Sequence, residues 1–224
     1  MVSSKRPPRK RRAVTEALKD ARRDAILAAA QTLFCQEPFE SIAMSDIAAE
    51  AGLAKGTLYL YFRTREEIFL ALLTRELAAW FAAFAEASKS FASAEAALDW
   101  IAFSLAERRE LVHLGSLLHA ALERNVPVEA ARRFKLAGEA ALTGIAPDLA
   151  RALRLPAEEQ ARRFLRWLQA SFVGLHQLAS PAPAVRAAMA AEPSLAGLAI
   201  DFHTELRAML GALLAGIRQE ESSS

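Results

Sequence analysis

Residues 45–62, SDIAAEAGLAKGTLYLYF, have the pattern of two short helices joined by a tight turn. Ser45 stands where a helix N-cap is expected, because its hydroxyl can accept a hydrogen bond from a free backbone N–H. Gly52 follows the first apolar face, and glycine tolerates the left-handed conformation that ends many helices. Leu53 and Leu58 would form the underside of the second helix. The pattern predicts a helix-turn-helix suited to the DNA major groove, although the spacing alone also fits an ordinary helical hairpin.

The residues in and around this stretch resemble the N-terminal domain of the TetR family of transcriptional regulators. That family has a glycine turn, then Ser/Ala-Lys-Gly-Thr-Leu-Tyr, then Tyr-Phe, then a basic residue and Glu opening the next helix. Leu53–Tyr59 and Tyr61–Phe62 match this pattern. Ala54 stands where many members carry Ser, and Arg65 stands where many carry Lys. The resemblance in sequence covers roughly residues 23–73, and beyond them only length and helical character agree.

The resemblance implies DNA contacts for individual side chains. Thr57 and Tyr59 would face base edges in the major groove, which carry the sequence information. The other contacts would be made near the start of the recognition helix or to phosphates, by Ser45, Lys55, Gly56, Tyr61 and Arg65. For Tyr61 an alternative is open, because it and Phe62 could simply pack the domain. Leu60 occupies a site where the family often carries a polar residue, so base readout would be thin.

The charge of the chain is unevenly distributed. Residues 1–65 hold twelve Lys and Arg against seven Asp and Glu, whereas residues 66–224 hold sixteen against nineteen. A basic N-terminal part on a mildly acidic body is expected of a protein that reads DNA with one end. Residues 1–20 include the proline-containing basic run Lys5–Arg12 and should form a disordered arm. The arm would follow phosphates or a minor groove, or would only be a solubilising tail.

The remaining sequence predicts an all-α protein of about nine helices, rich in alanine and poor in β-branched residues. We expect a DNA-binding domain at 21–65, called the head, and an effector-binding and dimerisation domain at 66–224, called the body. A long helix over Thr64–Ser88 would belong to both. The other expected helices are about 20–36 in the head and 94–109, 111–124, 127–145, 158–179 and about 195–218 in the body, with a possible short helix at 184–191 and a connector at 148–155 between Pro147 and Pro156.

Body helices of this family usually enclose an effector pocket, and the resemblance implies one here. Pockets of this kind are mostly apolar with a few polar groups, although most aromatic residues must fill the core of such alanine-rich helices. The candidate pocket residues are Trp80, Phe84, Trp100, Phe103, His113, Leu117, His119, Phe134, Trp167 and His176. For each histidine a purely structural role is the open alternative. Their spacing does not fit a metal site, so no metal is expected.

Two helices carry long apolar seams at steps of three and four residues, which predict a homodimer. Two such helices from each chain would form a four-helix bundle. The seam residues are Phe164, Trp167, Leu168, Phe172 and Leu175 on the first helix and Leu198, Phe202, Leu206, Met209 and Leu213 on the second. The alternative is that both seams face the core of their own chain.

Other classes of protein are disfavoured. The sequence has no glycine-rich phosphate loop, nucleophile elbow or paired-cysteine motif, so we expect neither an enzyme nor a cofactor. No run approaches the roughly 20 apolar residues of a membrane span, and the basic N-terminus lacks the apolar core of a secretory signal. The single cysteine, Cys35, permits no internal disulfide and should be buried.

The sequence therefore predicts a cytoplasmic DNA-binding regulator. Its expected partners are a palindromic double-stranded operator, a second copy of the chain and a small apolar or amphipathic effector of unknown identity, with no membrane. Repression is favoured and activation is left open. The rival hypothesis is a helical scaffold or membrane-surface protein that uses the basic arm.

Overall fold

The computed structural model describes residues 9–222, and these residues form helices and connecting turns with no strand. The head is built from α1 (Arg9–Gln36), η1 (Phe39–Ser41), α2 (Met44–Glu50) and α3 (Lys55–Leu58). The body is built from α4 (Arg65–Ala87), η2 (Ser88–Ser90), α5 (Ala94–Glu107), α6 (Arg109–Leu117), the π-helix η3 (Leu118–Leu122), α7 (Val128–Ala152), α8 (Glu158–Ala179), α9 (Pro183–Ala191), η4 (Pro193–Leu198) and α10 (Phe202–Ser222). The predicted all-α fold class is confirmed.

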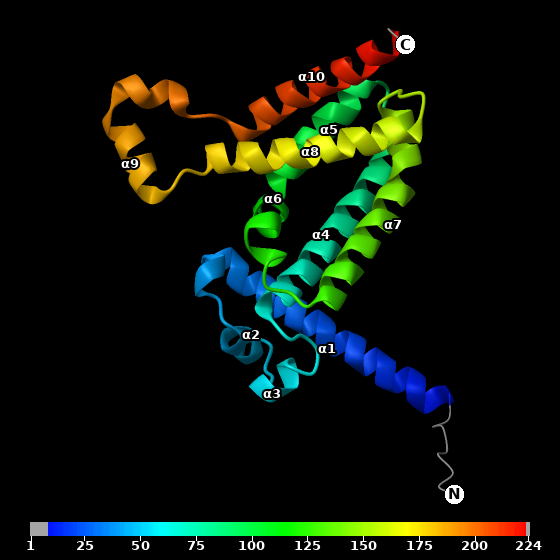
Figure 1. Ribbon diagram of the computed structural model, residues 1–224, viewed down its shortest axis with the longest axis vertical. Coiled ribbons are helices and arrows are strands. Elements are labelled where there is room, and N and C mark those ends of the chain that lie inside the picture. The colour runs from blue at the N-terminus through cyan, green and yellow to red at the C-terminus, as the bar shows by residue number, and fades with distance from the viewer. Residues whose placement is uncertain (1–8, 223–224) are drawn as a thin grey trace, which may run out of the picture.

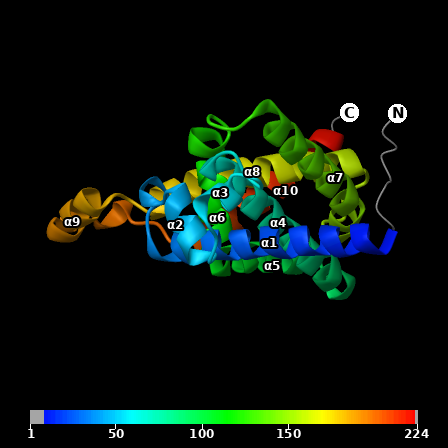
Figure 2. The same cartoon turned by 90° about the horizontal axis from the view of Figure 1, so that it is seen from below.

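The head lies at one end of the molecule and a layer formed by α8 and α10 lies at the other (Figure 1). Between them α4 and α7 run side by side. α1 packs against α2 and α4, α6 packs against α4 and α8, and α5 packs against α10. Buried side chains of head and body join in one hydrophobic core. The view from below shows α1 crossing under the body and the α9 segment projecting far to one side (Figure 2).

Helix α4 is the element that joins head and body, as the sequence predicts. Thr64 is its N-cap and accepts a hydrogen bond from the Glu67 N–H at 3.2 Å. Ile68 and Phe69 are buried near its head end, and Trp80 and Phe84 are buried near its other end. Residues 65–90 are also long and apolar enough to span a membrane by composition alone. Within the described residues, however, α4 packs against α1, α6 and α7 as the central helix of the bundle, and this position accounts for its apolar composition.

Helix α1 begins earlier than predicted. Residues 1–8 of the expected basic arm lie outside the described residues, but the chain is helical from Arg9 onward, whereas disorder was expected to residue 20. No proline or glycine follows Pro8 before Pro38, and the intervening Arg, Lys, Ala and Glu residues are strong helix formers. Residues 16–25 are all exposed, although the Arg23 guanidinium lies 4.5 Å from the centre of the Phe62 ring.

Helix α7 continues where a connector was expected. It runs through Pro147 to Ala152 without ending at Ile145. Proline removes the hydrogen bond to the Thr143 carbonyl, but Thr143 and Pro147 are both exposed, so water can hydrate that carbonyl. Burial of the neighbouring Ile145, Ala146, Leu149 and Ala150 holds the helix together.

The last helix begins at Phe202, later than the predicted start near Leu195. Pro193 opens the 3₁₀ helix η4, and Asp201 then ends the connection by accepting a hydrogen bond from the Thr204 N–H at 2.8 Å. The carboxylate caps the first turn of α10. The periodicity of apolar residues does not reveal such a cap, so it did not predict where the helix begins.

Cys35 is exposed, so the prediction that it is buried was wrong. Phe34 takes the buried position in the last turn of α1, and the next residue along a helix points about 100° away. The Cys35 thiol lies 3.8 Å from the Glu110 carboxylate. Partial shielding from water and this carboxylate raise the pKa of Cys35, so the side chain remains an unreactive thiol.

Candidate functional site

The turn between α2 and α3 has the geometry of a helix-turn-helix. Gly52 has a φ of 65°, in the left-handed region that favours glycine. The Leu53 N–H donates to the Ala48 carbonyl at 2.8 Å, and Ala48 is buried where the chain crosses back. Leu58 is fully buried beneath α3. The underside of α3 is therefore fixed in the head core and its opposite face is turned to solvent.

The predicted recognition residues lie on this outer face. Lys55, Gly56 and Tyr59 are exposed, and Thr57 is half-buried at its edge. Leu60 is 83% exposed just beyond α3. An apolar side chain displayed at the end of a recognition helix can contact a thymine methyl group, a contact that a search for polar readers overlooks.

Ser45 does not cap α2. The N-cap is Ala43, whose N–H donates to the Asp46 carboxylate at 2.8 Å. The carboxylate reaches back from the third helical position, so the serine hydroxyl is not needed for capping. Ser45 instead lies exposed in the first turn, 3.4 Å from the second oxygen of Asp46. It stays a candidate for a phosphate contact.

Arg65 holds the head to the body. Its Nη1 donates to the carbonyls of Phe39 at 2.9 Å and Ile42 at 2.7 Å, and its guanidinium lies 4.3 Å from the centre of the Phe39 ring. Nε donates to Glu66 at 3.1 Å. The sequence predicted a phosphate contact for Arg65, but most of its hydrogen-bonding capacity is used to fix η1 against the start of α4. Tyr61 is half-buried and packs against the core.

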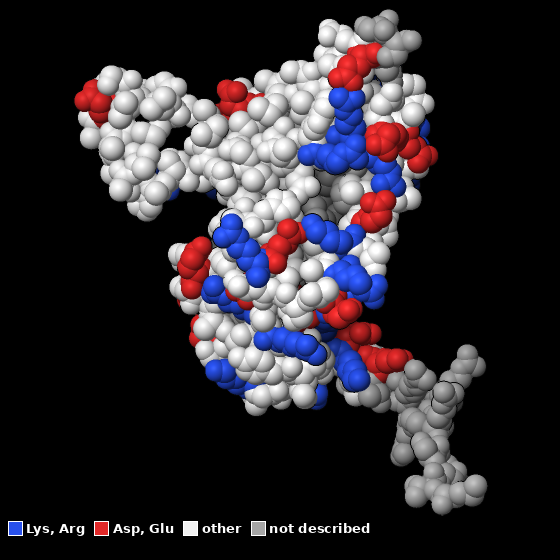
Figure 3. All heavy atoms as spheres, viewed as in Figure 1, with Lys and Arg blue, Asp and Glu red and all other residues white. Residues whose placement is uncertain are grey.

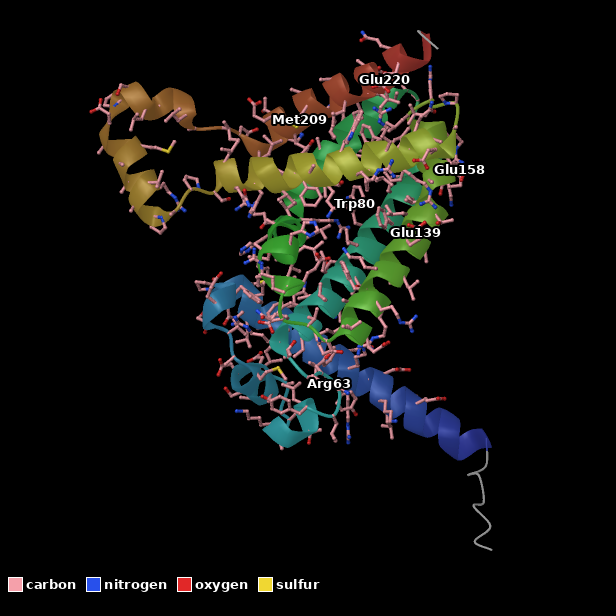
Figure 4. All side chains as sticks on the ribbon, viewed as in Figure 1. Arg63, Trp80, Glu139, Glu158, Met209 and Glu220 are labelled. Carbon is pink, nitrogen blue, oxygen red and sulfur yellow. The ribbon has the colours of Figure 1, made fainter. Side chains whose placement is uncertain are left out.

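Glu67 connects the end of the recognition region to the body. One carboxylate oxygen accepts a hydrogen bond from the Arg63 N–H at 2.8 Å. The other accepts one from Arg133 of α7 at 2.6 Å. The carboxylate of Glu67 is buried, whereas the Arg133 side chain that pairs with it is 60% exposed. Figure 4 marks Arg63 at the junction of the head with α4.

The body contains a cavity of about 280 Å³. Its wall is mostly apolar, with Lys135, Glu139 and Gln169 as the charged or amide groups. The lining residues come from five helical segments: Leu73, Leu77, Trp80 and Phe81 of α4, Gly115 of α6, Leu118 of η3, Phe134, Lys135, Gly138, Glu139 and Leu142 of α7, and Leu165, Leu168, Gln169 and Phe172 of α8. Figure 4 labels Trp80 on α4 below α8 and Glu139 on α7. An apolar wall with few polar groups is typical of a small-molecule site.

Two local features shape this cavity. A Cβ at Gly115 would lie 2.7 Å from Cε2 of Phe172, so only glycine lets the phenyl ring reach this position. The π-helical turn η3 follows α6 directly and supplies Leu118. Glu123, at its end, is paired with Lys135 at 2.5 Å and with His119 at 2.9 Å. Such π-helical turns are frequent at functional sites.

Only two of the predicted pocket residues, Trp80 and Phe134, line the cavity. Phe84 and Trp100 lie behind Trp80, with ring centres 6.3 and 6.1 Å from its own, and support it from α4 and α5. Trp80 also donates to the Ser104 hydroxyl at 3.0 Å. These aromatic residues therefore position the wall rather than form it.

Other predicted residues face elsewhere. Phe103 is exposed and contacts His203 of α10, because Ile101, Ala102 and Leu105 occupy the buried face of α5. His119 is exposed on η3. Leu117 and Trp167 are half-buried, and the Arg163 guanidinium covers the Trp167 ring at 4.3 Å. Sequence reasoning missed Lys135, Glu139 and Gln169, although Gln169 is a polar residue within the apolar stripe of α8 and could have been noticed.

His113 and His176 lie beside each other where three helices meet. Their ring centres are 5.5 Å apart, and His113 also stacks on Phe34 of α1 with ring centres at 4.7 Å. Burial lowers the pKa of both rings, and His113 lowers that of His176 further. Both rings are therefore neutral at pH 7. Within residues 9–222 no group of three His, Cys, Asp or Glu side chains lies close enough together to hold a metal ion.

The predicted dimer seams are divided between the core and the surface. Phe164, Leu168, Phe172, Leu175 and Leu206 are buried within their own chain. Trp167, Phe202 and Leu213 are half-buried, while Met209 and Leu198 are exposed. The buried residues therefore agree with the alternative interpretation, in which the seam faces the core of its own chain.

Comparison with known proteins gives two family matches. The model of bacterial regulatory proteins, tetR family, matches residues 26–72. The model of the tetracyclin repressor-like C-terminal domain matches residues 74–221. Together they span the helix-turn-helix and the cavity.

Curated relatives match through their N-terminal part. The chain is 45% identical over 56 residues to the uncharacterized HTH-type transcriptional regulator YfiR of Bacillus subtilis, covering 25% of this chain and 27% of that protein. It is 39% identical over 72 residues to the HTH-type transcriptional regulator EthR of Mycolicibacterium smegmatis, covering 32% of this chain and 33% of EthR. These matches thus span about a quarter to a third of the length of the relatives.

Solved structures share the whole fold. A TetR transcriptional regulator from Rhodococcus sp. RHA1 superposes with a TM-score of 0.57 and 21% identity, covering 88% of this chain and 97% of that one. FadR of Thermus thermophilus, in complex with lauroyl-CoA, gives a TM-score of 0.57 and 23% identity over 86% and 93% of the two chains. FadR of Bacillus subtilis, in complex with stearoyl-CoA, gives 0.55 and 17% over 86% and 97%.

Proposed function

Because the chain belongs to the TetR family of DNA-binding transcriptional regulators, we propose that it is a repressor released from a palindromic operator by a small apolar or amphipathic effector. The main support for this proposal is that α4 contacts both the head and the cavity of the body. Its first turn fixes the head through Arg65 and Glu67, and its later turns supply Leu73, Leu77, Trp80 and Phe81 to the cavity wall.

DNA would be read by the outer face of α3. Thr57, Tyr59 and Leu60 would meet base edges, while Lys55 and Ser45 would contact phosphates. A homodimer presents two such helices, so half-sites should lie about one helical turn apart, roughly 34–36 Å. Binding to DNA implies a cytoplasmic location.

The effector would occupy the cavity of the body. Its apolar wall suits an acyl chain or a ring system, and Lys135, Glu139 and Gln169 suit a polar end. Two FadR proteins of similar fold were crystallised with lauroyl-CoA or stearoyl-CoA, which makes acyl-CoA esters rational first probes. No enzymatic step is part of this proposal.

Release would follow from the contacts that converge on Glu67. Phe134 and Lys135 line the cavity, and the residue before them, Arg133, bonds to Glu67. A ligand that moves α4 or α7 therefore moves the groups that hold the Arg63 backbone beside the recognition helix. The effector must bind the DNA-free state better, by a coupling free energy of typically about 1–3 kcal/mol.

The test combines operator selection with a distance measurement. DNA selected from a random library by the full chain should contain an inverted repeat bound by two chains. Spin labels at Thr57→Cys in a Cys35→Ser background, measured without DNA, should then change their separation when lauroyl-CoA, stearoyl-CoA or dodecanoic acid is added, whichever releases the parent chain from DNA. An unrepeated half-site bound by one chain would refute the dimeric reader, and release without any change in separation would refute the transmission through α4.

A further inference from the structure

The segment between α8 and α10, residues 181–200, projects from the body as an arm. It contains α9 and η4, and neither has a buried residue. The two pack mainly against each other, and neither contributes to the core shared by head and body. Figures 1 and 2 both show the arm extending beyond the end of α8, away from every other helix.

The arm is almost free of charge. Its sequence, PAPAVRAAMAAEPSLAGLAI, holds Arg186 and Glu192 as its charged residues. Val185 is 51% exposed and Leu198 is 63% exposed. In Figure 3 the arm is nearly all white, in contrast to the charged surface of the head and body. Helices this short are not stable in water without packing, and monomers rarely display so continuous an apolar surface.

We propose that the arm clasps a second copy of this chain, packing on the exposed part of the partner's α8–α10 layer. The proposal rests on the homodimer of the proposed function and adds the surface that secures it. Leu178, at the end of α8, and Met209 of α10 are exposed apolar side chains of that layer. An arm of this length is comparable with the roughly 20–30 residues that each partner gives to a standard interface.

The composition of the arm argues against other partners. Nucleic acid would call for several Lys or Arg residues, and a membrane surface for a basic polar face, whereas the arm has one Arg. Depletion of charge matches the core of a protein interface. Two identical chains related by a two-fold axis would each give an arm and receive one, so both apolar surfaces are covered at once.

Charge substitutions in the arm test this directly. Val185→Glu with Leu198→Glu should leave the core of the chain folded, because both side chains are exposed within one chain. They should weaken the dimer at least tenfold in sedimentation equilibrium. The matched control is Val128→Glu on α7, which is 79% exposed and far along the chain from the arm. A dimer of unchanged affinity in the double variant would overturn the clasp.

Thiol labelling gives an independent measurement. In a Cys35→Ser background, Val185→Cys should react with a maleimide at least ten times more slowly than Val128→Cys in the dimer. On dilution to monomers the rate at Val185→Cys should rise toward the rate at Val128→Cys. Equal rates in the dimer would overturn the clasp. Neither experiment involves DNA, so a dimer that clasps correctly but selects no operator would refute the proposed function alone.

Discussion

Gly115 shows how a single residue sets the shape of the cavity. A methyl group there would push the Phe172 ring from its place, since the Cβ would come within 2.7 Å of it. We expect Gly115→Ala to weaken binding of the fluorescent probe 1-anilinonaphthalene-8-sulfonate about tenfold or more. Stability should fall, but by less than the overpacking cost of about 1–3 kcal/mol, because Ala gains roughly 0.5–1 kcal/mol over Gly in a helix.

Gly138→Ala is the matched control for this prediction. Gly138 also lines the cavity from a helix, but a Cβ there would meet nothing within 4 Å. It should gain helix stability and bind the probe nearly as the parent does. Thermal melts and probe titrations check both variants, and identical behaviour of the two would contradict the role given to Gly115.

The paired histidines predict a loss of stability in mild acid. Because the folded chain lowers the pKa of His113 and His176, the unfolded chain binds protons first as the pH falls below about 6.5. The contribution of the two neutral histidines to the stability of the folded chain is complete above that pH and is lost as the pH falls below it. Between its folded and unfolded pKa, each histidine can lower the free energy of unfolding by up to about 1.4 kcal/mol per pH unit. The loss is smaller here because the rings are only half-buried.

The charged groups around this pair are few. Glu40 raises the pKa of His113 slightly, while the remaining face of His113 is covered by Phe34. Urea melts at pH 7.5 and 5.5 should therefore show a smaller loss for His113→Gln than for the parent chain. An equal loss in both would assign the acid sensitivity to other groups.

At the scale of elements, we expect α7 to link the cavity to the head, because it lines the cavity and its Arg133 bonds to Glu67. Arg133→Ala should leave DNA affinity without effector within a few-fold of the parent, because Glu67 keeps its bond to the Arg63 N–H. The ability of lauroyl-CoA, or another releasing probe, to lower DNA affinity should fall from the typical range of about 5–150-fold toward none. Arg132→Ala is the control, since Arg132 pairs with the exposed Glu129 on its own helix.

Fluorescence anisotropy with labelled operator, with and without the probe, measures this coupling. Full release in Arg133→Ala would show that α4 alone transmits the signal. Loss of release in Arg132→Ala as well would point to a general weakening of α7.

The elements predicted best were those with strong local signals. Gly52, Leu53 and Leu58 fix the helix-turn-helix by their own chemistry, and Thr64 and the apolar residues after it fix α4. The bonds that join elements were not predictable. Arg133 and Glu67 are far apart in sequence, and surface arginines have too many possible partners for spacing to choose one. Pro147 was misjudged because its effect depends on whether water reaches the freed carbonyl.

At the scale of the whole molecule, the division between core and interface is what the sequence could not show. Leu206 and Met209 are three residues apart on α10 and belong to one apolar pattern. Yet Leu206 is fully buried within the chain and Met209 is 39% exposed. When a helix is apolar on more than one face, periodicity does not tell which face meets the chain's own core. The same ambiguity applies to Phe164, Phe172 and Leu175, which are buried within the chain.

This division predicts opposite outcomes for two similar substitutions. Leu206→Glu places an unpaired charge in the core and should prevent stable folding. Met209 of α10 is partly exposed, so Met209→Glu should leave the chain folded while separating the dimer. Circular dichroism and sedimentation measurements on the two variants distinguish these results.

The Met209→Glu monomer would also change how the protein binds DNA. A dimer neutralises phosphates with two heads and a monomer with one, so the slope of log affinity against log salt should fall to about half. Affinity for the operator should fall steeply at moderate salt, whereas the intact α3 should still protect one half-site. A folded Met209→Glu chain that remains dimeric, with an undiminished salt slope, would place the two-fold axis away from the α8–α10 layer.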